Sequence, residues 1–169
     1  MFGEYKYTNS WEKYKMMKNI QYYNNNAQEF YSRTINTDLS DNYKAFTSYL
    51  PEQAHILDAG CGVGRDTKYF LSQRYQVTAF DGSTEMVKLA TKETGIDVLH
   101  STFQDIDFKE SFDGVWAQAT LLHVPIMKQS MCIKNSCCIK AGRHFLCFLR
   151  IQFIYNVMIA IFTICMKIQ

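Results

Sequence analysis

The sequence predicts an α/β domain built on a doubly wound, mainly parallel sheet. Short apolar runs typical of strands alternate with helix-like segments between residues 54 and 117, and the links between them are short. This alternation favours parallel strands joined by right-handed crossovers. A chain of 169 residues, 47% of them hydrophobic, is long enough to bury one core of this kind.

The region before the first strand is predicted to be largely helical. Residues 1–25 are rich in Tyr, Lys and Asn and have weak periodicity, so we expect a mobile arm or a short helix there. The spacing of apolar residues over 27–35 suits an amphipathic helix. A second helix is expected over Ser40–Leu50, because Pro51 follows and stops it.

The predicted sheet has four strands: His55–Asp58, Gln76–Phe80, Ile96–Leu99 and Phe112–Ala117. Helices over residues 65–74 and 84–94 connect the first three strands. Ser83 is placed to cap the second of these helices, and Gly95 is placed to end it. The loops that follow parallel strands lie along one edge of the sheet, which is where open α/β sheets bind ligands.

A glycine-rich loop, Asp58-Ala59-Gly60-Cys61-Gly62-Val63-Gly64, follows the first strand. Its glycines allow a sharp turn and a close approach of a ligand to the backbone, as in Rossmann-like folds. A dinucleotide-binding loop would have glycine at position 65, where this chain has Arg65. Asp58 would also repel a diphosphate, whereas a carboxylate there suits a ligand with an ammonium and a sulfonium group.

Further acids follow the next two predicted strands. Asp81 ends the second strand, 21 residues after Gly60, where a carboxylate can accept hydrogen bonds from both hydroxyls of a ribose. Gln104 and Asp105 follow the third strand, within reach of an adenine amino group. Asp58, Asp81 and Asp105 should therefore converge at the carboxyl edge of the sheet. Each also has a simpler interpretation, as a cap or a polar loop residue.

These motifs resemble class I S-adenosylmethionine-dependent methyltransferases, and most of all the small bacterial tellurite-resistance-type enzymes. The resemblance extends to the segments Ala79–Ser83, Phe103–Asp105 and Phe112–Pro125. The resemblance covers residues 20–127 and implies S-adenosylmethionine as cofactor. It implies that Asp58, Gly60 and Gly62 surround the methionine part, that Asp81 holds the ribose, and that Gln104 and Asp105 border the adenine. It places residues from Ala117 onward at the sulfonium and Arg33 at the cofactor's carboxylate. Cys61, Gly82, Met86 and His123 complete the implied site.

Methyl transfer from a sulfonium needs alignment of donor and acceptor and exclusion of water more than a particular nucleophile or a metal. We therefore name no catalytic residue. His123 is a candidate base, but its apolar neighbours also suit a histidine that packs and hydrogen-bonds. Tyr22 and Tyr23 are placed either to close over the cofactor or to pack as part of the arm.

The last third of the chain has a different composition. Residues 1–113 hold all 16 acidic residues, residues 114–169 hold six Lys and Arg and no acid, and five of the six cysteines follow residue 131. The family pattern fades after Pro125. We therefore divide the chain into an arm (1–25), a methyltransferase domain (26–127) and an atypical apolar tail (128–169). We expect the sheet to be incomplete at its C-terminal end.

A frameshift or truncation near residues 126–131 explains this contrast. Suppose that the codons for residues 132–148 are chosen from A+T-rich options and are read one nucleotide later. They can then encode an Ala- and Leu-rich helix, a glycine turn and an aromatic strand, which are the elements that the family has there. Under this hypothesis the acceptor pocket lacks a wall and the chain is inactive. Sequencing the coding DNA across codons 125–135 tests it, because an intact frame there contradicts it.

The first 25 residues lack the apolar core of a signal peptide, so we expect a cytoplasmic protein with reduced cysteines. The apolar run 151–166 is short for a membrane span and contains Gln152 and Asn156, which argues against an anchor. The basic residues of the tail are dispersed, so we expect no nucleic-acid partner. The cysteine and histidine spacings match no metal site.

The sequence therefore predicts an S-adenosylmethionine-dependent methyltransferase with a small-molecule acceptor. Two alternatives stay open. One is a non-catalytic module or remnant that holds the cofactor without turnover. The other is a nicotinamide-dependent oxidoreductase, which Arg65 and Asp58 disfavour.

Overall fold

The computed structural model describes residues 10–106, 108, 111–120, 138–139, 146–151 and 160–163. The helices are α1 (Ser10–Thr34), α2 (Ser40–Thr47), α3 (Arg65–Ser72) and α4 (Thr84–Thr94). The strands are β1 (His55–Ala59), β2 (Gln76–Asp81), β3 (Leu99–His100), β4 (Ser111–Phe112), β5 (Gly114–Gln118), β6 (Cys138–Ile139), β7 (Leu146–Ile151) and β8 (Ala160–Thr163).

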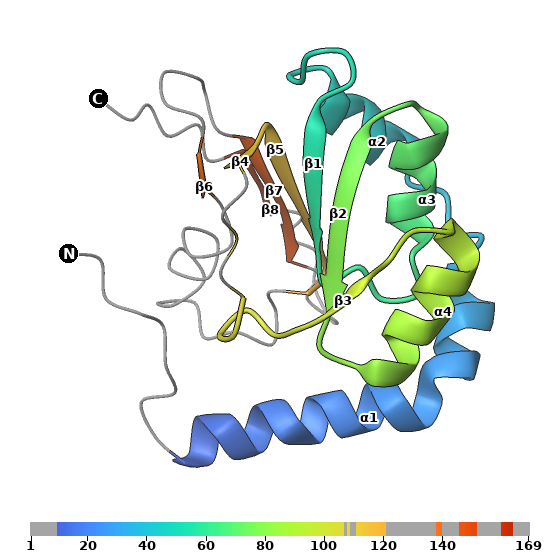
Figure 1. The fold of residues 1–169 in the computed structure, drawn as a ribbon, viewed down its shortest axis with the longest axis vertical. Helices are drawn as coiled ribbons and strands as arrows, with labels where there is room; N and C mark the ends of the chain where they lie inside the picture. The colour runs from blue at the N-terminus through green and yellow to red at the C-terminus, as the bar shows by residue number, and fades with distance from the viewer. Residues whose placement is uncertain are drawn as a thin grey trace.

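Six strands form one sheet in the order β3-β2-β1-β5-β7-β8 (Figure 1). All neighbouring pairs are parallel except β7 and β8, which are antiparallel. The short strands β4 and β6 pair separately. The predicted α/β class and mainly parallel, Rossmann-like sheet are confirmed. The strands β2 and β3 lie on one side of β1, and the strands β5, β7 and β8 lie on the other. The strand order therefore reverses between β1 and β5, which is where open sheets of this type bind ligands.

Strands β7 and β8 come from the tail that was expected to depart from the family pattern. β7 pairs with the whole of β5, from Gly114 opposite Leu146 to Gln118 opposite Arg150. The sheet thus has a fifth parallel strand and an antiparallel strand beyond it. An open sheet edge can pair with any extended segment of suitable register, because the ladder is made by main-chain groups. The helix that the family pattern puts after the fourth strand falls on residues outside the described ones.

Several predicted boundaries shift in the structure. α4 and its Ser83 cap agree with prediction, but α1 already begins at Ser10 and β3 begins only at Leu99. The predicted fourth strand is divided into β4 and β5 at Asp113. The backbone of Asp113 donates to the His55 carbonyl at 2.8 Å, and its carboxylate accepts from the His55 amide at 2.9 Å. The Asp113 carboxylate therefore replaces a main-chain carbonyl as the acceptor for the His55 amide, and this interrupts the strand.

Helices α2, α3 and α4 lie on the same side of the sheet (Figure 1). An aromatic cluster fills the space beneath α2 and α3, with Tyr43, Phe46, Phe70 and Trp116 all buried. Phe46 and Phe70 each lie within 5.3 Å of the Trp116 ring, between centroids. Gly114 is required here, because a Cβ on it would come within 2.9 Å of the Phe46 ring.

A buried carboxylate, Asp66 in the first turn of α3, organises this cluster. It accepts hydrogen bonds from the Tyr43 hydroxyl at 2.6 Å and from the Trp116 indole nitrogen at 2.8 Å. The neighbouring Arg65 guanidinium binds both carboxylate oxygens, at 2.6 and 3.0 Å. One side chain thus joins α2, α3 and β5, and its charge is both paired and hydrogen-bonded as burial requires.

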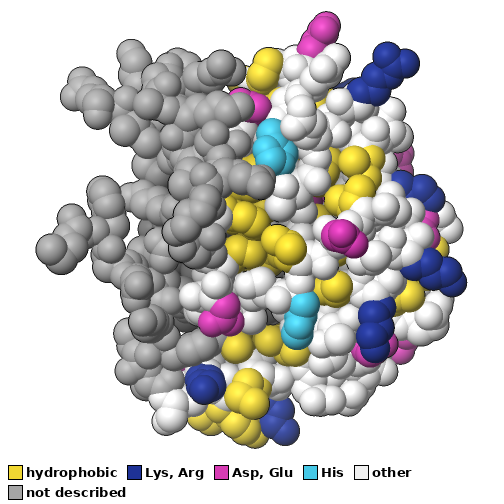
Figure 2. All heavy atoms as spheres, in the orientation of Figure 1, with side chains coloured by type: hydrophobic (Ala, Val, Ile, Leu, Met, Phe, Trp, Pro, Cys, Tyr) yellow, Lys and Arg dark blue, Asp and Glu magenta, His cyan; other side chains and the backbone are white. Residues whose placement is uncertain are grey.

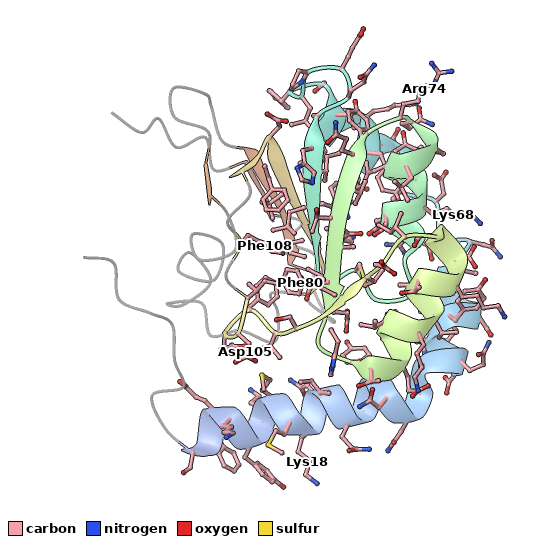
Figure 3. The ribbon with its side chains drawn as sticks, viewed as in Figure 1. Lys18, Lys68, Arg74, Phe80, Asp105 and Phe108 are labelled. Carbon is pink, nitrogen blue, oxygen red and sulfur yellow. The ribbon has the colours of Figure 1, made fainter. Side chains whose placement is uncertain are left out.

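The opposite side of the sheet carries a second group of phenylalanines. Phe80 of β2 contacts Phe103 and Phe108, and Phe108 contacts Phe112. Figure 3 labels Phe80 and Phe108 on this side, away from the helical layer. Figure 2 shows hydrophobic side chains gathered over the same part of the molecule. Apolar side chains therefore lie on both faces of the sheet, as a parallel sheet requires.

The first part of helix α1 runs across the carboxyl end of the sheet, whereas its last part lies against α4, where the Tyr31 hydroxyl donates to the Glu93 carboxylate at 2.7 Å (Figure 1). A kink at Asn26, with φ −118° and ψ 15°, divides it into two parts. The part before the kink leaves Trp11, Tyr14, Met17 and Tyr22 exposed. Among the described residues, no helix has the length and apolarity needed to cross a bilayer.

The Asp66 cluster leads to a stability prediction. Tyr43→Phe removes only the hydroxyl that binds Asp66, so the free energy of unfolding should fall by about 1.5–3 kcal/mol, the range for a hydrogen bond to a charged group. Tyr69→Phe is the matched control: its ring stacks on Tyr43 at 3.9 Å, and the change should stay within about 0.5 kcal/mol. Urea unfolding followed by circular dichroism measures both. Equal losses in the two variants would contradict the role of Asp66.

Candidate functional site

The glycine-rich loop turns sharply at the carboxyl end of β1. Gly60, Gly62 and Gly64 all have positive φ, at +75°, +56° and +84°. The amides of Gly60 and Cys61 both donate to the carbonyl of Phe80 in β2, at 2.9 and 3.0 Å. The loop is thereby fixed to the neighbouring strand before the chain enters α3.

Two of these glycines are needed for packing. A Cβ on Gly60 would lie 2.0 Å from the Thr120 hydroxyl, and one on Gly64 would lie 3.0 Å from the Ala90 backbone in α4. The surroundings of Gly62 differ, because a Cβ there would meet a single atom of the described residues within 4 Å, on the ring of Phe30 at 3.8 Å. Within the part of the chain that the structure describes, the loop therefore has its free space at Gly62.

Asp81 ends β2 directly beside that space. One carboxylate oxygen accepts from the Gly62 amide at 2.9 Å, and the other accepts from the Ser83 amide at 2.8 Å. Burial raises the pKa of Asp81, while its backbone hydrogen bonds act in the opposite direction. The two amides fix the orientation of the carboxylate and leave each oxygen a further lone pair for a ligand.

Asp58 lies deeper, beneath the loop. Its side chain is buried and accepts a hydrogen bond from the Thr67 hydroxyl at 2.6 Å. Burial raises the pKa of Asp58 to about 8, and the negative charges of Asp66 and Asp81 act in the same direction. This carboxyl group therefore gains or loses its proton near neutral pH, and a nearby positive charge would favour the ionised form.

The loop after β3 brings the third acid to the same edge. The Ser101 amide donates to the Asp81 carbonyl at 3.1 Å, which ties the loop to β2. Within the loop, the Thr102 hydroxyl donates to the Asp105 carboxylate at 2.6 Å and accepts from the Gln104 amide at 3.3 Å. Figure 3 shows Asp105 at the lower end of the sheet, near the carboxyl ends of the strands. Asp58 and Asp81 lie close enough for the charge of Asp81 to raise the pKa of Asp58, whereas the convergence of Asp105 with these two carboxylates stays a prediction.

Helix α1 provides a wall over this edge, made in part by residues other than the Tyr22 and Tyr23 expected from the sequence. The Asn24 side chain accepts from the Ser83 hydroxyl at 2.7 Å and from the Glu85 amide at 3.2 Å, so it supplements the cap of α4. Ile20 would contact a Cβ on Gly82 at 3.4 Å. Burial and the nearby Asp81 charge raise the pKa of Tyr23. Asparagine commonly caps the helix that follows it directly in the sequence. Asn24 instead bonds to the first turn of a helix 61 residues away, so the sequence around α4 gives no sign of it.

The other predicted site residues are placed differently. Met86 and Ala117 are buried, in the first turn of α4 and in β5. Arg33 lies on the exposed surface of α1 and pairs with Glu29 at 3.3 Å. His123 lies outside the described residues. The roles assigned to all these residues stay predictions.

Comparison with known proteins agrees with this architecture. Residues 57–145 match the family model described as a methyltransferase domain. An uncharacterized methyltransferase of Staphylococcus carnosus (strain TM300) is 29% identical in an alignment 113 residues long, which covers 62% of this chain and 55% of the relative. The chain therefore spans about half the length of that relative.

Solved structures share the fold. A TehB-like SAM-dependent methyltransferase from Corynebacterium glutamicum superposes with a TM-score of 0.61 at 18% identity, over 77% of this chain and 73% of that protein. Magnesium protoporphyrin IX methyltransferase from Synechocystis PCC 6803, solved with bound SAM, gives 0.61 at 18% identity, over 82% and 77%. The DhpI-SAM-HEP complex gives 0.62 at 20% identity, over 81% and 66%.

The family match covers more than half of the chain and includes the end of β1, the glycine loop, Asp81 and β5. The chain belongs to the methyltransferase domain family.

Proposed function

We propose that this chain binds S-adenosylmethionine at the carboxyl edge of β1, β2 and β3 and transfers its methyl group to a small-molecule acceptor. The observation that carries the proposal is the Asp81 carboxylate, held by the amides of Gly62 and Ser83 beside the open space at Gly62. A carboxylate fixed in this way at the end of the second strand is suited to two neighbouring ribose hydroxyls. Two structures of the same fold with bound SAM support it, the DhpI-SAM-HEP complex and magnesium protoporphyrin IX methyltransferase.

The side chains around the glycine-rich loop fit this cofactor. Asp58 and Asp81 lie below and beside the loop, and a ligand that carries a sulfonium and an ammonium group would favour their ionised forms. Gln104 and Asp105 offer an amide and a carboxylate for an adenine amino group. When bound, S-adenosylmethionine supplies an already activated methyl group. The chain's own residues bind and orient it, and α1 excludes water from the edge.

A nicotinamide cofactor fits the same edge less well. Arg65 occupies the position that would need a third glycine, and its guanidinium is bound to Asp66. A diphosphate at the N-terminus of α3 would also lie near Asp58 and Asp66, both buried acids. A dianion there would raise the pKa of Asp58 further, so these acids offer it no favourable contact. Binding of S-adenosylhomocysteine without binding of NAD separates the two functions.

A second candidate function is cofactor binding without turnover. The observation that favours it is the acid-free composition of residues 114–169, which contrasts with the rest of the chain. A chain that binds S-adenosylhomocysteine but methylates none of a panel of amines, phenols and thiols from radiolabelled S-adenosylmethionine supports this alternative. Turnover with any of them supports a methyltransferase.

The ribose role of Asp81 is directly testable. Asp81→Ala should weaken the binding of S-adenosylhomocysteine by about 1.5–3 kcal/mol, or roughly 10- to 150-fold, because two hydrogen bonds to a charged acceptor are lost. Asp97→Ala removes an exposed acid before β3 and should leave the affinity unchanged. Isothermal titration calorimetry measures both, and circular dichroism confirms that they fold. Unchanged affinity in a folded Asp81→Ala variant contradicts the ribose role.

Raised pKa values at the site predict a pH-dependent affinity. Burial makes Asp58 and Asp81 hold their protons more tightly than free aspartic acid, whereas a cationic ligand favours their ionised forms. Binding of S-adenosylmethionine should therefore release protons, and its affinity should rise as pH increases from 5.5 to 7.5, by at most about tenfold per pH unit for each proton released.

Two comparisons sharpen this test. S-adenosylhomocysteine lacks the sulfonium charge, so its affinity should rise less steeply with pH. Asp58→Asn removes one of these two carboxyl groups and should flatten the curve for S-adenosylmethionine. Calorimetry in two buffers of different ionisation enthalpy counts the released protons. Identical pH profiles for wild type and Asp58→Asn would show that Asp58 does not sense the ligand's charge.

A further inference from the structure

The outer face of α1 before the kink carries aromatic side chains that the protein leaves in contact with water. Trp11, Tyr14 and Tyr22 are 69%, 50% and 57% exposed. Six large hydrophobic side chains are exposed in the part of the chain that the structure describes, and four of them lie on this segment. Exposed apolar side chains on a soluble protein are usually scattered singly, whereas a gathered group marks an interaction surface.

A lysine completes this face. Lys18 lies four residues after Tyr14 and four residues before Tyr22. Trp11 lies three residues before Tyr14, so all four side chains follow one line along the helix, which we call the α1 stripe. The Trp11 and Tyr14 rings stack with 5.7 Å between their centroids, and the Lys18 Nζ lies 5.5 Å from the centroid of the Tyr14 ring. Figure 3 shows Lys18 directed away from the sheet.

The same segment of α1 is positively charged. Between Ser10 and Asn26 it holds three lysines and one acid, Glu12. Glu12 is partly buried in the first turn, where a negative charge complements the helix dipole. Lys15 is exposed one turn after Trp11, beside the stripe. Figure 2 shows hydrophobic and basic side chains together along the lower edge of the molecule, where α1 lies. A partner for this face should therefore carry negative charge and accept aromatic side chains.

An anionic lipid surface meets both requirements. Tyrosine and tryptophan combine an apolar ring with a polar tip, which suits them to the level of the headgroups, and lysine reaches anionic headgroups with its apolar stem packed below. The stripe is straight and spans about 16 Å of helix, so a flat surface can contact all of it. A single-stranded nucleic acid would need open ring faces for its bases, whereas Trp11 and Tyr14 stack on each other.

We propose that the α1 stripe, with Lys15 beside it, docks this protein on an anionic lipid surface. The contact is peripheral, so it differs from the membrane anchor that the composition of the tail argues against. The inner face of the same segment covers the ligand edge, where Ile20 lies against Gly82. Docking would therefore bring that edge within about one helix diameter, roughly 10 Å, of the headgroups. The proposal requires neither cofactor nor turnover, so it stands or falls independently of the proposed function.

Flotation of the full chain with lipid vesicles tests the proposal. The protein should float with vesicles of equal parts phosphatidylcholine and phosphatidylglycerol, and not with phosphatidylcholine alone. Raising the salt concentration from about 0.1 to 1 M should release it, because the screening length falls from about 10 to 3 Å. Lys15→Gln combined with Lys18→Gln should weaken binding roughly 10- to 30-fold, since each lysine near an anionic surface contributes. Trp11→Ala combined with Tyr14→Ala should weaken it about tenfold, through lost ring contact.

The matched control is Lys44→Gln combined with Tyr49→Ala, which removes a lysine and a tyrosine from the surface of α2 and the loop after it. Tyr49 is 68% exposed, and this variant should bind vesicles as the wild type does. Circular dichroism checks that each variant folds, and Trp11→Ala alone replaces the aromatic pair if that pair does not. Equal losses in the control, equal binding to both vesicles, or no binding at all would overturn the proposal. Release from the vesicles by an oligothymidylate would overturn it in favour of a nucleic acid.

Discussion

The carboxylate of Asp66 is the contact on which the rest of the described structure depends. It is buried in the first turn of α3 and receives donors from α2, from β5 and from its own neighbour Arg65. The next residue, Thr67, donates to Asp58 beneath the ligand edge. One helical turn therefore connects the aromatic core to the candidate site. A change in the packing of Tyr43 or Trp116 would shift the same turn that positions Asp58, so stability and ligand binding are coupled through α3.

The site itself is assembled from backbone more than from side chains. The Phe80 carbonyl holds the loop through two amides, and two further amides hold the Asp81 carboxylate. Such an arrangement depends on strand register and on left-handed glycines, and much less on the identity of neighbouring side chains. It can persist at the 18–20% identity shared with the solved methyltransferases. Acceptor selectivity must then come from residues outside this frame.

Local signals predicted the centre of the domain well. Ser83, Gly95 and the glycines after β1 each act on their immediate neighbours, so α4 and the loop could be placed from the sequence. Contacts between distant segments could not. Asn24 reaches α4, Asp66 gathers donors from three elements, and Asp113 interrupts a strand by bonding to His55. Each depends on an arrangement in space that leaves no periodicity in the chain.

The two tryptophans of the chain occupy opposite environments. Trp116 is fully buried with its indole nitrogen bound to Asp66, whereas Trp11 is 69% exposed on the outer surface of α1. Their fluorescence should therefore separate into a blue-shifted emission protected from aqueous quenchers and a red-shifted emission open to them. A collisional quencher such as iodide would suppress the second signal and leave the first. The unmodified protein thus contains one optical reporter for its core and another for the helix that crosses its ligand edge.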